Sequence, residues 1–170
     1  MHNYKTHFFL AFSLVALLMS GCGRLGGNID TCSLVSKSDA ESILLKPAHL
    51  DKEATAELDR LSSSAPGVSG TCVYTSDGAA NPSRIVVGYR NYESAELIKS
   101  AFEDSRSNVW KSKAQQTVDG VGDEAVLLDG HLVALRKGKT WLQLGIEQPE
   151  GSEFSVEALK SVAKHAGSSL

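Results

Sequence analysis

Hydrophobic residues are most concentrated near the N-terminus, over residues 8–19, where Ser13 is the single polar position. A twelve-residue helix would be about 18 Å long at ~1.5 Å per residue, whereas the hydrocarbon core of a bilayer is about 30 Å thick. The run is therefore too short for a membrane-spanning helix. With the positive charge of Lys5 before it and small residues after it, the segment is typical of a cleavable signal peptide.

Beyond residue 30, apolar residues recur with the spacing of amphipathic helices in four places. The first predicted helix carries a capping-box pair at Ser38 and Glu41, and it ends before Pro47. The strongest helical pattern covers residues 92–105. The other two predicted helices cover residues 50–61 and 155–166.

Shorter segments rich in β-branched and aromatic residues predict about five strands between these helices. Adjacent strands have mostly short connections, which favour antiparallel pairing. The expected architecture is therefore α+β, with helices packed mainly on one face of an antiparallel sheet. Residues 30–170 are expected to form a single domain behind a short tether at residues 22–29. The predicted strands cover residues 71–75, 84–90, 125–128, 131–137 and 140–147.

A two-residue Gly-Lys turn at residues 138–139 fixes the register of one predicted hairpin. It places apolar pairs on one side of the ribbon and Arg136 opposite Trp141 on the other, because side chains alternate along a strand. If helices cover only the apolar side, then Arg136, Trp141 and Gln143 form an exposed candidate binding face, with the Arg136 guanidinium over the indole. The alternative is that the second face is covered as well, and that Trp141 belongs to the core.

The apolar run near the N-terminus ends at Met19-Ser20-Gly21-Cys22, which resembles the lipobox of bacterial lipoproteins. In such a sequence the cysteine thiol receives a diacylglycerol, and cleavage makes Cys22 the first residue of the mature protein. The resemblance implies a signal peptide over residues 1–21 and stable attachment through two or three acyl chains, palmitate among them. Met19 departs from the pattern, since Leu is commonest there. The alternative is an ordinary secretory signal that happens to contain a cysteine.

Two further cysteines remain, Cys32 and Cys72. Disulfides persist outside the cytoplasm, and with Cys22 committed to lipid only one pairing is left. We therefore predict a disulfide between Cys32 and Cys72, with a pair of buried free thiols as the alternative. A redox-active pair is disfavoured, because the spacing Cys-x-x-Cys is absent.

The charge of the chain argues against nucleic acid as a partner. Removal of residues 1–21 would leave 16 basic and 20 acidic side chains, a net charge of −4, whereas phosphate backbones are bound by an excess of basic groups. No cofactor is indicated, since the glycines at 120 and 122 do not extend to a dinucleotide fingerprint. No catalytic or metal residue is predicted either. Ser161 and Lys164 have Ser-x-x-Lys spacing without its companion motifs, and the nearby carboxylates at 119, 123 and 124 fit no calcium loop.

Three short segments carry a second resemblance. They are a Cys-Ser-Leu-Val-Ser opening at residues 32–36, a Cys-Val-Tyr segment at residues 72–74, and Val-Asp-Gly-Val-Gly-Asp-Glu-Ala at residues 118–125. In this order they resemble small secreted bacterial lipoproteins of uncharacterised domain families, known especially from actinobacteria. The resemblance covers roughly residues 30–148 and implies an exported α+β domain with a cysteine bridge. It implies no activity, because those families have no general assigned chemistry.

The leading hypothesis is a membrane-anchored, non-enzymatic binding module of the cell envelope, whose ligand is an envelope protein, a glycan or a small molecule. One alternative is an inhibitor or regulator of another envelope protein, and another is a hydrolase with an unrecognised site. In a Gram-negative cell Gly23, which is not the aspartate associated with inner-membrane retention, favours the outer membrane facing the periplasm. In other bacteria the outer leaflet of the plasma membrane is expected.

Overall fold

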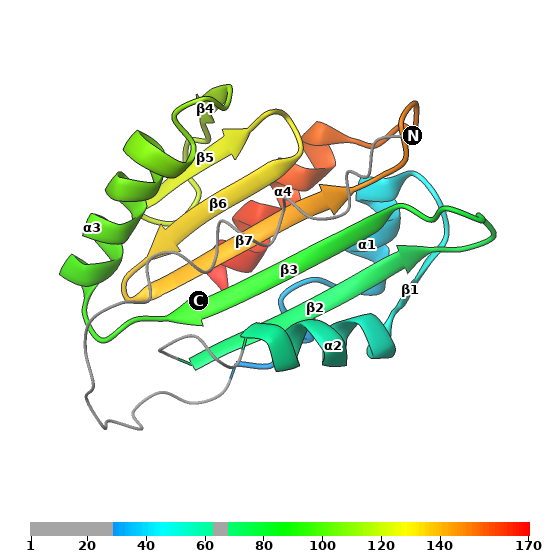
Figure 1. The fold of residues 1–170 in the computed structure, drawn as a ribbon, viewed down its shortest axis with the longest axis horizontal. Helices are drawn as coiled ribbons and strands as arrows, with labels where there is room; N and C mark the ends of the chain where they lie inside the picture. Colours follow the sequence, from blue (N-terminus) through cyan, green and yellow to red (C-terminus); the bar gives the residue numbers. More distant parts are fainter. Residues whose placement is uncertain (1–28, 63–67) are drawn as a thin grey trace.

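The computed structural model describes residues 29–62 and 68–170 (Figure 1). The predicted signal peptide, the lipid-attachment site at Cys22 and nearly all of the tether at residues 22–29 lie outside the described residues. Within the described ranges, none of the helices combines the length and the apolar character needed to cross a bilayer.

The centre of the fold is one seven-stranded antiparallel sheet, with strand order β1-β2-β3-β7-β6-β5-β4. This confirms an α+β fold built on an antiparallel sheet, but the predicted five strands are too few. The two strands that were not predicted, β1 and β4, are three residues long and form the two edges of the sheet. The strands are β1 (Ala48–Leu50), β2 (Val68–Ser76), β3 (Arg84–Asn91), β4 (Gln115–Thr117), β5 (Glu124–Leu128), β6 (Leu132–Lys137) and β7 (Thr140–Glu147).

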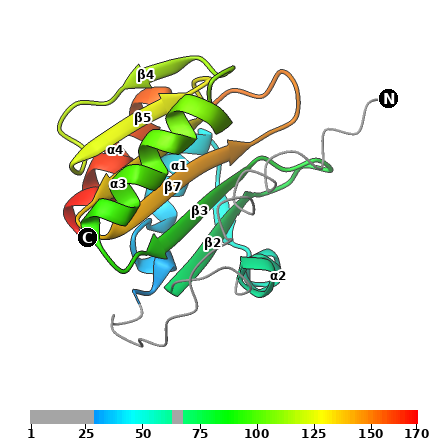
Figure 2. The same ribbon diagram turned by 60° about the vertical axis from the view of Figure 1, so that its left-hand side comes forward.

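Helices lie on both faces of the sheet, whereas the sequence predicted them mainly on one (Figures 1 and 2). Two of them, α1 and α4, pack on the same face, and α3 packs on the opposite face. The reason is that α3 has an apolar stripe, and the sheet has apolar residues on the face opposite α1 and α4. Packing of α3 against that face buries both. The helices are α1 (Lys37–Leu44), α2 (Lys52–Ser62), α3 (Ala95–Asp104) and α4 (Val156–Ser168), with short 3-10 and π turns at η3 (Thr31–Ser33) and η4 (Ser105–Val109).

The first helix begins with a capping box two residues earlier than predicted. The Asp39 amide donates to the Ser36 hydroxyl at 3.1 Å, and the Ser36 amide donates to the Asp39 carboxylate at 2.8 Å. The pair Ser38 and Glu41 has the same spacing, so spacing alone did not separate the two choices. Glu41 instead accepts a hydrogen bond from the amide of Ala48, at 3.3 Å.

The disulfide prediction is confirmed. Cys32, next to the first helix, is bonded to Cys72 in β2, and their Cα atoms are 5.1 Å apart. Cys72 is completely buried in the larger of two hydrophobic cores, between the sheet and helices α1 and α4. The Tyr74 hydroxyl, two residues along β2, donates to the Val35 carbonyl at 2.7 Å. The N-terminal segment of the domain is thus held to β2 both covalently and by a buried hydrogen bond.

Helix α2 occupies the edge of β2 where no strand pairs with it. Strand β1 pairs with β2 only over residues 74–76, so the earlier amides of β2 need other partners. The Thr71 amide donates to the Asp59 carboxylate at 2.6 Å, and the Val73 amide donates to the Thr55 hydroxyl at 3.0 Å. These side chains replace a neighbouring strand, and they block an edge that would otherwise offer unpaired backbone groups to another chain.

Candidate functional site

The predicted hairpin register is confirmed. The turn lies between Lys137 and Thr140, and Arg136 is the partner of Trp141 as the two-residue turn requires. Ala134 is likewise the partner of Gln143. The sequence therefore placed these side chains on the correct side of the ribbon.

The same side of the ribbon is nevertheless not an exposed binding face at Trp141, so this part of the prediction is wrong. Helix α3 covers it, and the side chain is only 7% exposed. The indole ring lies 5.3 Å from the Phe102 ring, 5.8 Å from that of Trp110 and 6.2 Å from that of Tyr92, measured between ring centroids. Trp141 is thus the centre of a second, smaller core, which was the alternative interpretation of the sequence.

Arg136 and Gln143 do not form a common exposed surface with Trp141. The Arg136 side chain, 15% exposed, donates from Nε to Glu124 at 3.1 Å, and its Nη1 lies 3.6 Å from Asp123. Arg106 binds the other oxygen of Glu124 at 2.6 Å. The Arg136 guanidinium therefore belongs to an ion-pair network with β5 and not to an indole-binding contact, while Gln143 stays half-buried in the ladder opposite Gly88.

The segment at residues 118–125, which carries part of the family resemblance, has a structural explanation. The Asp123 amide donates to the Arg136 carbonyl, and the Asp123 carboxylate accepts from the Gly138 amide, each at 2.8 Å. These two hydrogen bonds hold the loop against the β6–β7 turn. Gly122 has a φ of +59°, and a Cβ atom there would lie 2.5 Å from the Arg136 carbonyl oxygen. Glycine is required at this position both for backbone conformation and for close approach.

Replacing Gly122 with alanine is expected to lower the free energy of unfolding by about 2 kcal/mol, because a positive φ is strained and the new methyl group meets a backbone oxygen. Gly130→Ala is the matched control, since Gly130 has a φ of +77° but nothing within 4 Å of a Cβ. Urea denaturation of both variants separates the two causes. Equal losses would show that the contact with Arg136 contributes nothing.

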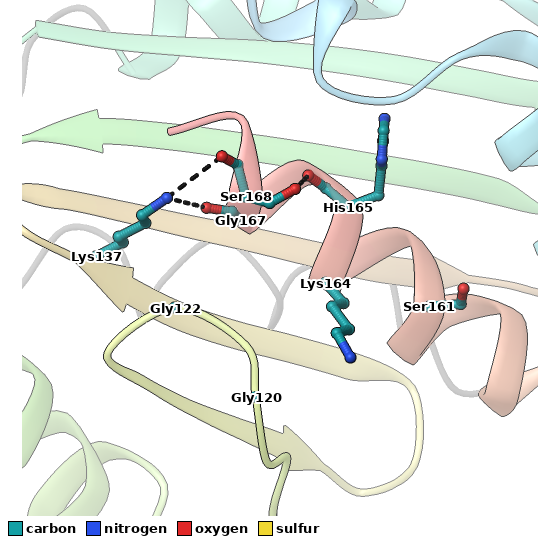
Figure 3. A pocket seen from close by; sticks show the side chains of 8 residues that line it. All are labelled: Gly120, Gly122, Lys137, Ser161, Lys164, His165, Gly167 and Ser168. Atoms are coloured by element: carbon teal, nitrogen blue, oxygen red, sulfur yellow. Dashed lines mark hydrogen bonds between the residues drawn. The ribbon is translucent and has the colours of Figure 1, made fainter.

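A pocket of about 510 Å³ opens at the C-terminal end of α4, between that helix, the end of β6 and the glycine loop before β5 (Figure 3). The sequence did not predict it, because its walls come from three separate segments of the chain. Its lining residues are small, polar or basic: Gly120, Gly122, Lys137, Ser161, Lys164, His165, Gly167 and Ser168.

Lys137 is committed to the end of α4. Its ammonium group donates to the carbonyls of Gly167 and Ser168 at 3.0 and 3.3 Å. Lys164 instead extends toward the glycine loop, while Ser161 and the His165 ring point away from it (Figure 3). Among the described residues, no hydrogen bond joins Ser161 to Lys164, so the fold does not assemble a Ser-x-x-Lys catalytic pair there.

A histidine–carboxylate pair lies at the opposite end of the sheet. His49 Nδ1 is 2.6 Å from the Asp77 carboxylate, and both side chains are about half exposed. Such a pair orients a general base in hydrolases, yet within the described ranges no hydroxyl or thiol is hydrogen-bonded to His49. The described residues likewise contain no group of three or more His, Cys, Asp or Glu side chains that could hold a metal ion.

Comparisons with protein-family models, with curated proteins and with solved structures find no match for this chain. The lipoprotein-family resemblance at residues 32–36, 72–74 and 118–125 therefore stays a prediction.

Proposed function

We propose that this protein is an exported, lipid-anchored binding domain of the bacterial cell envelope, attached to its membrane through Cys22. The observation that carries the proposal is the Cys32–Cys72 disulfide. Disulfides of this kind belong to oxidising compartments outside the cytoplasm. Since the chain has three cysteines, the pairing leaves Cys22 as the remaining thiol, at the position where the lipobox resemblance requires the lipid.

Binding accounts for the described surface better than catalysis does. The pocket beside α4 offers an ammonium group and exposed glycines without a paired nucleophile and base. The His49–Asp77 pair would suit the alternative of a hydrolase, but the groups around it include no bonded nucleophile among the described residues. We therefore assign the domain a non-enzymatic role, with an envelope protein, a glycan or a small molecule as its ligand.

The anchoring can be tested by intact-mass analysis of the protein purified from membranes of its native host. The expected species begins at Cys22 and carries the mass of a diacylglyceryl group and a further acyl chain. A Cys22→Ser variant should keep its signal peptide and lose the lipid mass, whereas a Cys32→Ser variant should still be lipidated. A wild-type species that retains Met1, or one that begins at residue 22 without lipid, would contradict the proposal.

A further inference from the structure

The lining of the pocket beside α4 is basic. Lys137 and Lys164 contribute ammonium groups to it, and no acidic side chain is among the lining residues. The C-terminal end of a helix carries a partial negative charge of about half an electron, which by itself would repel an anion. Lys137 offsets that charge, because its ammonium group binds the carbonyls of Gly167 and Ser168. The positive charge of Lys164 is therefore not needed to offset the helix C-terminus, and it is available to a ligand.

Lys164 is placed to meet a ligand at the glycine loop. Its side chain is exposed and makes no hydrogen bond or ion pair within the described part of the chain. A Cβ atom on Gly120 would lie 3.9 Å from the Lys164 ammonium nitrogen, so the loop and the charge face each other across a short gap. Lys160, one turn earlier on the same helix, is by contrast paired with Glu157 at 3.0 Å.

The glycine loop supplies backbone donors on the other side of the pocket. Gly120 and Gly122 have φ values of +70° and +59°, and Val121 between them does not have a positive φ. Turns that contain such left-handed residues are a common setting for anion binding by backbone amides, although the next amide, that of Asp123, is already bonded to the Arg136 carbonyl. Both glycines are exposed, and their amides donate no hydrogen bond to any described residue.

We propose that the pocket between α4, β6 and the loop at residues 118–123 binds the phosphate group of a small molecule or a lipid headgroup, through the Lys164 ammonium group and the amides of Gly120 and Gly122. A volume of about 510 Å³ exceeds that of a phosphate ion and leaves room for the rest of a phosphate ester. This inference rests on the proposed function only in assigning a binding role to the domain. It does not depend on the lipid at Cys22.

The test is a calorimetric titration of the detergent-solubilised full-length protein with inorganic phosphate and with acetate. Phosphate should bind and acetate should bind more weakly, because a tetrahedral dianion can accept from the ammonium group and the amides together. Lys164→Gln should weaken phosphate binding about tenfold, the effect of losing one charge-assisted hydrogen bond. Lys160→Gln, one turn earlier on the same helix, is the matched control and should leave the affinity unchanged.

A second titration with short-chain phosphatidic acid identifies the source of the phosphate. Tighter binding than inorganic phosphate, still dependent on Lys164, supports a lipid headgroup, and equal binding supports a soluble phosphate ester. Absence of saturable binding by both probes would overturn the proposal, as would equal weakening by Lys160→Gln and Lys164→Gln. Lipidation of Cys22 is measured by intact mass, whereas phosphate binding at Lys164 is measured by affinity. Failure of the proposed anchoring is therefore distinguishable from failure of the proposed binding site.

Discussion

Replacing Trp141 with alanine is expected to lower the free energy of unfolding by about 3–5 kcal/mol, the usual cost of removing a large aromatic side chain from a core. The indole is 7% exposed and contacts three other aromatic rings beneath α3. Its removal would leave a cavity between the helix and the sheet that neither element can close without shifting. Urea denaturation followed by circular dichroism measures the loss directly.

Gln143→Ala is the matched control for this variant, because Gln143 is two residues further along β7 on the same face and is only half-buried. Its expected cost is below about 1 kcal/mol, as for most partly exposed positions. A Trp141→Ala protein of wild-type stability would contradict the burial of the indole. If that protein also lost a binding partner, the prediction of an exposed binding face at Trp141 would be favoured again.

The contrast between Trp141 and its neighbours shows how far the sequence alone could lead. Period-two alternation and the Gly-Lys turn were sufficient to predict which side chains share a face, and the observed register agrees. They carry no information on which helix covers that face. Val126, Leu128 and Ala134 lie in the same small core as Trp141, and together they were the signal that the second face is apolar too.

The two strands that were missed show a different limit. All three residues of β4 are exposed, and its sequence Gln-Gln-Thr has no apolar alternation. Its strand conformation is imposed by pairing with β5, with Gln115 opposite Leu128. Short edge strands of this kind take their conformation from pairing with a neighbouring strand, so the propensity of their own residues does not identify them.

The pocket beside α4 was out of reach of sequence analysis for a related reason. In the sequence, the spacing of Ser161 and Lys164 suggests only a catalytic pair, and the glycines at 120 and 122 suggest only part of a nucleotide fingerprint. The fold instead brings Lys164 to Gly120, more than forty residues earlier in the chain. Antiparallel packing of β5 and β6 beneath α4 creates that proximity, and neither motif encodes it.

Removal of the disulfide in a Cys32→Ala/Cys72→Ala double variant is expected to lower the free energy of unfolding by about 4 kcal/mol, since the bond closes a loop between cysteines about 40 residues apart. Alanine is preferred over serine at Cys72, because that position is fully buried and a hydroxyl group there would need a partner. The loss is measured by urea denaturation of the double variant and, independently, of the wild type with and without a thiol reductant.

Tyr74→Phe provides the scale against which that loss is judged. It removes the hydrogen bond from Tyr74 to the Val35 carbonyl, which ties the same two segments together without a covalent bond, and a buried hydrogen bond contributes about 1 kcal/mol. If the double variant lost no more than Tyr74→Phe, packing around α1 would be holding the N-terminal segment in place and the disulfide would be dispensable. A loss several times larger, matched by reduction of the wild type, would show that the covalent link restricts the unfolded chain. The domain would then depend on an oxidising compartment for most of its stability, as a protein working outside the cytoplasm can.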